Sequence, residues 1–209
     1  MTYLSTRRIA IQSIAKGAIL TCAIGVLGSI SACSEKKPEF NAVDVTGADY
    51  AKDFALTDHN GQARTLADFK GKVVVLFFGY TQCPDVCPTT MAELAEVKKQ
   101  LGKDGDKLQA LFVSVDPERD TPTLLKAYMA NFDPSFLALR PTPEQLPELA
   151  KSFKMYYKKV DGKTPTSYTM DHSAGSYVYD PKGNLRLYNR YGAGTDLLVD
   201  DIRLLLKGA

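Results

Sequence analysis

A continuous apolar run followed by two cysteines constrains this chain more than any other feature. Residues 73–79 are three valines, a leucine, two phenylalanines and a glycine. Such a run is too apolar for a strand with one solvated face, so it predicts a fully buried strand. Cys83 and Cys87 follow, and a polar segment able to form a helix occupies residues 89–101. This order places two thiols at the rim of a sheet, where disulfide exchange, metal binding and a structural crosslink are all open.

The first 32 residues have the layout of an export signal. Their charged residues are Arg7, Arg8 and Lys16, and residues 17–32 are almost wholly apolar or small, which is the order of a secretory signal. The apolar run is shorter than the roughly 20 residues that a spanning helix needs. Residues 30–33 resemble a bacterial lipobox, in which the cysteine becomes the lipidated first residue of the mature protein. We therefore expect a lipoprotein signal peptide over residues 1–32 and lipidation at Cys33; ordinary cleavage and an uncleaved anchor are the alternatives.

The charge and cysteine counts change once this signal is set aside. The chain has 26 basic and 24 acidic side chains, and three of the basic ones lie in the signal, so the remainder has 23 against 24 and a net charge of −1. This balance gives no support for nucleic-acid binding. Cys22 leaves with the signal and Cys33 is expected to carry the lipid. Cys83 and Cys87 then remain as thiols in a compartment that tolerates disulfides.

The rest of the chain predicts one α/β domain behind a short tether. Residues 33–46 are polar and lack apolar periodicity, which predicts a flexible tether, and residues 47–209 are enough for one domain. Strands are expected at 54–56, 63–65, 73–79, 109–115, 136–139, 155–160, 167–170, 176–179 and 185–188, and helices at 89–101, 121–132, 142–153 and 195–206. Alternating strands and helices imply parallel pairing, and the last two strands form a hairpin. The prediction is a thioredoxin-like fold, a central mixed sheet flanked by helices with an N-terminal β-hairpin extension.

The spacing of the two thiols differs from that of a redox Cys-x-x-Cys motif. Cys83 and Cys87 enclose three residues rather than two. Pro88 disfavours helical geometry at the residue before it and suits a first helical turn, so we place Cys87 at the N-cap. Unpaired N–H groups and the helix dipole favour a thiolate there. Two thiolates are a soft donor set that suits Cu(I) or Zn(II), and zinc generally takes four ligands, so two cysteines and one histidine suit copper better.

His172 is the candidate third donor. It is expected in the loop before the C-terminal hairpin, which in a thioredoxin-like fold faces the cysteines and usually carries a proline. An ordinary loop histidine is the alternative, as is a structural disulfide for the cysteines. The other histidine, His59, lies in a hydrophilic turn and is expected to be solvated. Asp116 and Asp120 follow a buried strand, and we expect them to form turns and caps, with a role at this functional rim as the alternative.

Three separated motifs resemble the Sco/SenC family. They are residues 78–88 with both cysteines, residues 114–122, and residues 170–173 with the histidine. The similarity covers about residues 47–207. Family members are thioredoxin-like copper-binding proteins that help to assemble the dinuclear copper site of cytochrome c oxidase. The resemblance implies that Cys83, Cys87 and His172 bind one copper, as Cu(I) or Cu(II). Many relatives carry a transmembrane helix where this chain is expected to carry a lipid.

These expectations favour a metallochaperone over an enzyme. The domain is expected on the periplasmic or extracytoplasmic side of the cell envelope, tethered to the membrane by its lipid. It would pass copper by ligand exchange to the copper-site subunit of cytochrome c oxidase or another copper protein, and could receive it from an upstream donor. The alternative is a thiol-disulfide oxidoreductase, in which one of Cys83 and Cys87 attacks and the other completes a redox disulfide. A peroxiredoxin-like peroxidase would want an arginine beside the cysteines, and the sequence places none there.

Overall fold

The structure, a computed structural model, describes residues 38–164 and 167–209. The expected signal peptide over residues 1–32 and the expected lipid site Cys33 lie outside the described residues. Within the described part of the chain, no helix is both long and apolar enough to cross a membrane.

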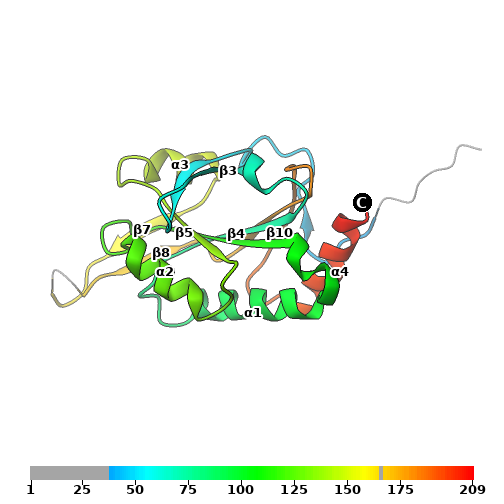
Figure 1. Ribbon diagram of the computed structural model, residues 1–209. Helices are drawn as coiled ribbons and strands as arrows, with labels where there is room; N and C mark the ends of the chain where they lie inside the picture. The colour runs from blue at the N-terminus through cyan, green and yellow to red at the C-terminus, as the bar shows by residue number, and fades with distance from the viewer. Residues whose placement is uncertain (1–37, 165–166) are drawn as a thin grey trace, which may run out of the picture. The chain divides into compact units, whose positions relative to one another are not determined.

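An eight-stranded mixed sheet forms the middle of the domain, in the order β1-β10-β9-β4-β5-β6-β2-β3 (Figure 1). Its strands are β1 Val43–Asp44, β2 Ala55–Asp58, β3 Ala63–Thr65, β4 Val73–Gly79, β5 Leu108–Ser114, β6 Leu137–Arg140, β9 Ser176–Tyr179 and β10 Leu185–Asn189. β4, β5 and β6 run parallel, and every other pairing in this sheet is antiparallel. The β2–β3 hairpin pairs with β6 at one side of the sheet. The predicted mixed sheet with an N-terminal hairpin extension is therefore confirmed.

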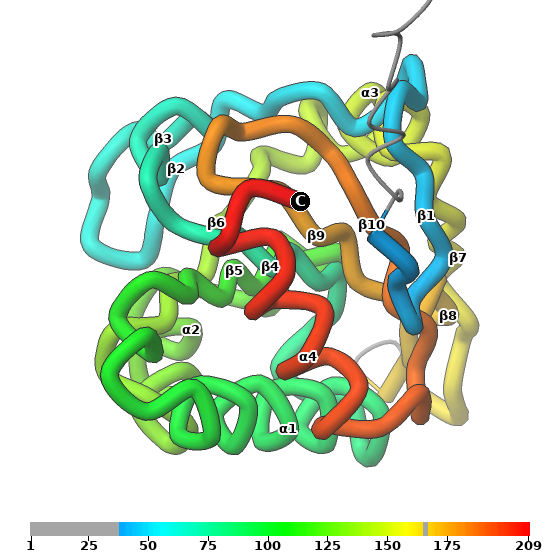
Figure 2. The backbone as a smooth tube through the Cα atoms, turned by 90° about the vertical axis from the view of Figure 1, so that its right-hand side faces the viewer, coloured from blue at the N-terminus to red at the C-terminus, as the bar shows by residue number. Residues whose placement is uncertain are grey.

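Four helices cover the sheet, and their positions follow the sequence pattern closely. They are α1 Val86–Gln100, α2 Pro122–Ala130, α3 Leu146–Ser152 and α4 Thr195–Leu206, with short 3-10 segments η1 Leu66–Phe69 and η2 Gly102–Lys107. Figure 1 shows α1 and α2 below the sheet and α3 above it, and Figure 2 shows α4 beside α1. The Thr121 side chain accepts a hydrogen bond from the backbone N–H of Leu124 and so caps α2, as the sequence predicts. The predicted bounds of α4 are confirmed at both ends.

The two central strands hold the core and bring the functional loops together. Every residue of β4 and of β5 is buried, so the near-continuous apolar sequence is that of parallel strands covered on both faces. Because the strands are parallel with Gly79 opposite Ser114, the loops that follow them leave from the same rim. β9 runs the other way and begins with Ser176 opposite Phe77, so the segment before β9 reaches that rim too.

The tether predicted over residues 33–46 is wrong for its described part, residues 38–46. β1 lies in this segment and pairs with β10. The backbone N–H groups of Asn41 and Ala42 donate to the carboxylate of Asp201 at 2.9 and 2.8 Å, and this aspartate is fully buried in α4. A two-residue strand is too short to show periodicity, and its main polar partner lies about 160 residues away, so the sequence pattern does not reveal this anchoring.

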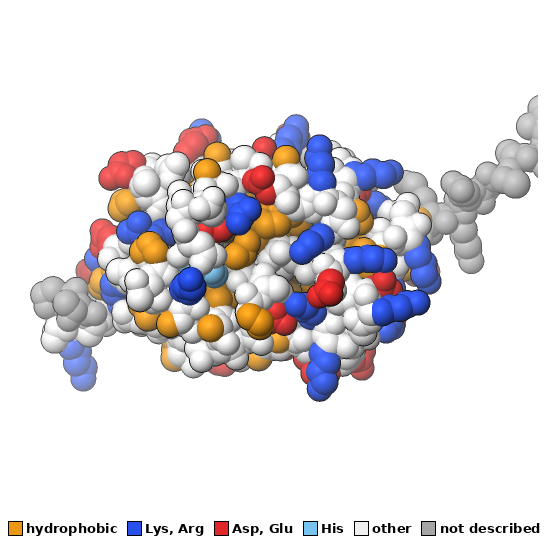
Figure 3. Space-filling view, viewed as in Figure 1, with side chains coloured by type: hydrophobic (Ala, Val, Ile, Leu, Met, Phe, Trp, Pro, Cys, Tyr) orange, Lys and Arg blue, Asp and Glu red, His pale blue; other side chains and the backbone are white. Residues whose placement is uncertain are grey.

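Charges of both signs lie on the face of the domain that Figure 3 shows. Lysine and arginine side chains are scattered over this face with aspartate and glutamate side chains among them, and hydrophobic side chains gather near its middle.

Candidate metal centre

The two cysteines lie on either side of the start of α1. Cys83 is half-buried in the loop after β4, and Cys87 is completely buried in the first turn of the helix. The N-cap of α1 is Asp85, so the prediction that Cys87 is the N-cap is wrong, and the helix starts earlier than residue 89. The reason is that the first four N–H groups of a helix have no partner within it, so Pro88 in the first turn costs no hydrogen bond.

The start of α1 directs a backbone donor at the sulfur of Cys83, so the expectation that the helix N-terminus favours a thiolate at Cys87 is wrong. The backbone N–H of Cys87 donates to the sulfur of Cys83 at 3.4 Å. A thiolate that accepts such a bond is favoured over a thiol.

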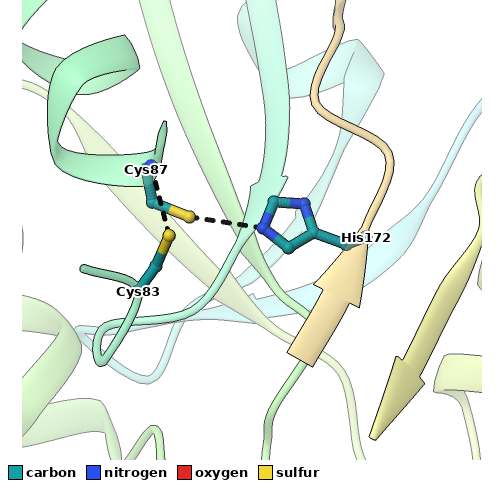
Figure 4. A group of neighbouring side chains, drawn as sticks. All are labelled: Cys83, Cys87 and His172. Carbon is teal, nitrogen blue, oxygen red and sulfur yellow. Dashed lines mark hydrogen bonds between the residues drawn. The ribbon is translucent and has the colours of Figure 1, made fainter. Parts of the chain in front are cut away.

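His172 completes the group from the opposite side. It is the last residue of β8, which runs over Thr169–His172 and pairs with β7 Tyr157–Val160 in a separate two-stranded sheet. The prediction that His172 lies in a loop is therefore wrong, because it ends strand β8. The prediction that it approaches the cysteines is confirmed. The Nε2 atom of His172 lies 3.4 Å from the sulfur of Cys87 (Figure 4).

Hydrogen bonding fixes which imidazole nitrogen faces the sulfurs as a potential ligand. The Nδ1 atom of His172 lies 3.0 Å from the backbone carbonyl oxygen of Ser173, which can only accept a hydrogen bond. Nδ1 therefore carries the hydrogen, and in the neutral ring Nε2 presents its lone pair to the cysteines. A hydrogen bond from the ring nitrogen that faces away from the metal orients histidine ligands in metal sites. Phe77 and Tyr80 pack edge-on against the ring, with centroids 5.9 and 6.0 Å away, and limit its movement.

The three side chains converge closely enough to share one metal ion. The two sulfurs of Cys83 and Cys87 and the nearest ring nitrogen of His172 all lie within 4.8 Å of one another. Three soft or borderline donors around one point match the coordination that Cu(I) accepts. The structure thus brings together the three residues that the sequence singled out, and their chemistry fits copper.

The surroundings shift the pKa values of the two thiols in opposite directions. A hydrogen bond from the Cys87 thiol, with smaller contributions from backbone N–H groups, lowers the pKa of Cys83 to about 5, although partial burial opposes this shift. Donating that bond and being buried raise the pKa of Cys87 above its usual range. The pair is therefore a thiolate at Cys83 beside a thiol at Cys87 at neutral pH. Both cysteines are free in the structure rather than joined in a disulfide.

Gly79 is a part of the site that the sequence analysis missed. A Cβ atom at this position would lie 2.9 Å from the sulfur of Cys87, 2.8 Å from the ring of Phe112 and 2.9 Å from the ring of Phe77. Carbon atoms do not approach that closely without displacing their neighbours. A glycine at the end of a buried strand is the signal that could have indicated this close approach.

The carboxylate of Asp120 is hydrogen-bonded to the loop that leads to Cys83. Its buried carboxylate accepts hydrogen bonds from the hydroxyl groups of Thr81 and Ser114 at 2.6 Å each, and from the backbone N–H of Thr81 at 3.2 Å. Burial raises the pKa of this carboxyl group, although the hydrogen bonds oppose the shift. Asp120 thus holds the segment that leads to Cys83, and the expectation that its side chain forms a cap is wrong, since the N-cap of α2 is Thr121.

Two further expectations need correction. His59 is half-buried, and its Nδ1 accepts a hydrogen bond from the backbone N–H of Ala138 at 3.1 Å, so the expectation that it is solvated is wrong. Burial also lowers the pKa of His59. The sequence placed no arginine near the cysteines, but Arg119 donates to the side chain of Gln82, next to Cys83, at 3.0 Å. The folding of the loop after β5 back over the rim brings this arginine there.

Comparisons with known proteins agree with the fold and identify the family. The family model described as SCO1/SenC matches residues 43–207. A mitochondrial SCO2 homolog from Bos taurus is 36% identical over 153 residues, which are 72% of this chain and 58% of that protein. This chain spans between 58% and 64% of the length of three such curated relatives.

Solved structures give the same result. ScoI from Bradyrhizobium japonicum, solved with copper bound, is 42% identical, with a TM-score of 0.68 and coverage of 76% of this chain and 99% of that one. BsSco, described as a member of the Sco family of cytochrome c oxidase assembly proteins with a disulfide switch, is 24% identical, with a TM-score of 0.61 and coverage of 79% and 98%. At that identity BsSco supports the fold alone. The predicted thioredoxin-like fold is confirmed, and the chain belongs to the SCO1/SenC family.

Proposed function

We propose that this chain is a copper metallochaperone that holds one copper ion through Cys83, Cys87 and His172. The observation that carries the proposal is the convergence of two sulfurs and an imidazole nitrogen within 4.8 Å of one another. The copper bound in the related ScoI structure supports the choice of metal. Because the described residues bring only three such donors together, the set suits three-coordinate Cu(I) better than structural zinc.

Binding would release a proton, because only one of the two cysteines is already a thiolate. Cys83 ionises at a pKa of about 5, whereas the Cys87 thiol must lose its proton to the solvent when copper binds. Metal affinity should therefore rise with pH, as for other thiolate sites.

The exposure of the three donors indicates the order in which they would release the copper. Cys83 and His172 are partly exposed and Cys87 is buried, so an incoming thiolate would replace Cys83 and His172 before it replaces Cys87.

The cargo would be delivered to the dinuclear copper site of cytochrome c oxidase or to another copper protein. Support comes from membership of the SCO1/SenC family, which the three motifs and the family model both indicate and whose members help to assemble that site. Ligand exchange requires a site at the surface, and the rim position provides one. An upstream copper donor would load the same three ligands by the reverse exchange.

A second candidate function is thiol-disulfide exchange, which the asymmetric thiol pair favours. The Cys83 thiolate would attack a partner's disulfide and release one partner thiolate. Cys87 would then lose its proton and displace the second, leaving a Cys83–Cys87 disulfide and two reduced partner cysteines. An external reductant of the dithiol class would restore the pair. His172 is not required for this reaction, which separates it from copper binding.

Copper binding by matched variants tests the proposal. We expect the full chain to bind one Cu(I) in competition with a chromophoric chelator, and His172→Ala to bind at least about tenfold more weakly because a ligand is lost. His59→Ala removes the chain's other histidine and should bind as the wild type does. Equal affinity of the wild type and His172→Ala would refute the assignment, and retained disulfide exchange in His172→Ala with no copper bound by any variant would favour the second function.

We also propose that a lipid on Cys33 tethers the domain to the cell envelope on its extracytoplasmic side. The lipobox-like sequence before Cys33 and the preceding apolar run support this. Protein extracted from membranes should carry the added mass of acyl chains, and Cys33→Ala should lack that mass. A mature protein of unmodified mass would rule out the lipid.

A further inference from the structure

The element that carries His172 is not part of the main sheet. β7 and β8 form a two-stranded sheet of their own, and the described residues contain no strand ladder that joins it to the eight-stranded sheet. The two cysteines, in contrast, follow the central strand β4 directly. Residues 173–175 link His172 to β9, which pairs with β4, and side-chain contacts between the small sheet and the cysteine loop add to this link in setting the distance between the histidine and the cysteines.

Arg119 joins the two parts at the residues that lead to the donors. Its Nη1 atom donates to the side-chain oxygen of Gln82 at 3.0 Å and to the backbone carbonyl of Tyr168 at 2.9 Å. Its guanidinium carbon also lies 3.5 Å from the centroid of the Tyr168 ring, a stacked arrangement that arginine favours. Gln82 immediately precedes Cys83, and Tyr168 immediately precedes β8. One guanidinium thus bridges the cysteine loop and the histidine strand.

The arginine is itself held in a fixed orientation. Its Nε atom donates to Asp116, whose other carboxylate oxygen accepts a hydrogen bond from the Tyr168 hydroxyl at 2.8 Å. The side chains of Arg119 and Asp116 are only 14% and 3% exposed, so this ion pair is shielded from water. Charge-assisted bonds in such surroundings are stronger than surface pairs.

Stability alone does not explain the buried group of Arg119, Asp116 and Tyr168. The Nη2 atom of Arg119 is buried and has no hydrogen-bond partner among the described residues. A buried donor left unpaired is destabilising, and replacing buried ion pairs by apolar groups often stabilises proteins. An arginine at this position therefore needs another explanation, and the bridge between the two donor-bearing segments provides it.

We infer that Arg119 is a positioning residue that holds His172 at the cysteine pair by tying Tyr168 to Gln82. The inference rests on the proposed copper site, since it assigns to that site the residue that sets its third donor. Without the bridge, the β7–β8 sheet can move away from the rim and take the imidazole with it. The copper site would then be reduced to two sulfurs.

The test combines Arg119→Gln with His172→Ala in the full chain. We expect Arg119→Gln to weaken Cu(I) binding by about tenfold, as is typical for partners of metal ligands. In a His172→Ala background the same substitution should change the affinity less than about twofold, because a residue that acts through the histidine has nothing left to position. Equal weakening with and without His172 would overturn the inference, as would unchanged binding by Arg119→Gln.

Two variants guard against a merely structural effect. Arg140→Gln is the matched control, because Arg140 binds the carbonyl of Pro117 in the loop that carries Arg119, at 2.6 and 3.2 Å. We expect copper affinity to be unchanged in it. Gln82→Ala alters an exposed side chain and should fold; losing its hydrogen bond should weaken copper binding about threefold in the presence of His172. No change in Gln82→Ala, or equal losses in Arg140→Gln and Arg119→Gln, would contradict the inference.

A measurement without copper separates this inference from the proposed function. The ring protons of His172 lie close to the faces or edges of Phe77 and Tyr80, whose ring currents displace their NMR signals. In the metal-free chain at fixed pH, Arg119→Gln should move these signals toward those of a free histidine, and Arg140→Gln should not. Moved signals in a protein that binds no copper would refute the proposed function but support the positioning role. Unmoved signals would refute the positioning role alone.

Discussion

Gly79 shows how one missing side-chain atom makes room for the site. Replacement by alanine would force a Cβ against the sulfur of Cys87 and the rings of Phe77 and Phe112, all at 2.8 to 2.9 Å. We expect Gly79→Ala to lower the free energy of unfolding by about 1–3 kcal/mol, the usual cost of overpacking a core. Urea denaturation of the metal-free chain would measure this.

The Cys87→Ala variant tests whether the contact with sulfur contributes to the cost of Gly79→Ala. In Cys87→Ala one of the three close contacts disappears, so adding Gly79→Ala should cost less than it does in the wild type. An equal cost in both backgrounds would show that the sulfur does not require the glycine.

Cys83 should be the more reactive thiol, and pH should reveal it. Its folded-state pKa of about 5 lies below the ordinary thiol value, so its thiolate forms as pH rises through about 5 and is complete at neutral pH. The alkylation rate of the Cys83 peptide, followed by mass spectrometry with a haloacetamide, should rise through that pH range once corrected for the reagent. The buried Cys87, with its raised pKa, should react more slowly throughout.

The hydrogen bond between the thiols supplies the control. Cys87→Ala removes the donor that lowers the pKa of Cys83, so the midpoint should move up toward the ordinary value. A wild-type midpoint near pH 9, or a midpoint that Cys87→Ala leaves in place, would contradict the assigned acidities.

At the scale of elements, the N-terminal segment is fixed to α4 by one carboxylate. Asp201 accepts from the backbone of Asn41 and Ala42 and also from the Asn41 side chain at 3.1 Å. Removal of this buried acceptor breaks three partly buried hydrogen bonds, so Asp201→Ala should destabilise the domain by about 1–3 kcal/mol. Hydrogen exchange should also speed up in residues 41–45. The neighbouring Asp200 side chain is exposed, and Asp200→Ala should change stability by less than about 0.5 kcal/mol. Similar effects of both substitutions would count against the anchor.

The elements that the sequence predicts well are those whose pattern is local. β4 and β5 are continuous apolar runs, α2 begins with a capping threonine and a proline, and α4 has a helical apolar pattern along its whole length. Each of these signals lies within the element itself, so no knowledge of the partner is needed.

The features that the sequence did not reveal depend on distant partners. β1 has two residues and pairs with β10, and the two residues before it bind Asp201 of α4, so the sequence of this segment carries no pattern of its own. The start of α1 was placed too late because the rule for the residue before a proline is weaker in the first helical turn. The roles of Gly79 and Arg119 arise from contacts with Phe112 and Tyr168, which are 33 and 49 residues away. The three donors were predicted because their residue types are rare in this chain and chemically distinctive.

At the scale of the whole molecule, the fold divides the site between a fixed part and an attached part. The cysteines extend from the central strand of a buried sheet, and the histidine comes from a small separate sheet at the same rim. Such a division keeps the buried Cys87 in place, whereas the partly exposed Cys83 and His172 can be displaced without disturbing the core. This arrangement suits a protein that must hold a metal ion and then give it up.

X-ray absorption at the copper edge of the Cu(I)-loaded chain would show which atoms bind the metal. We predict two sulfurs and one imidazole nitrogen around the copper in the wild type. The nitrogen should disappear in His172→Ala and remain in His59→Ala. A wild-type shell of sulfur alone, or an imidazole signal that persists in His172→Ala, would contradict the assignment of Cys83, Cys87 and His172 as the copper site.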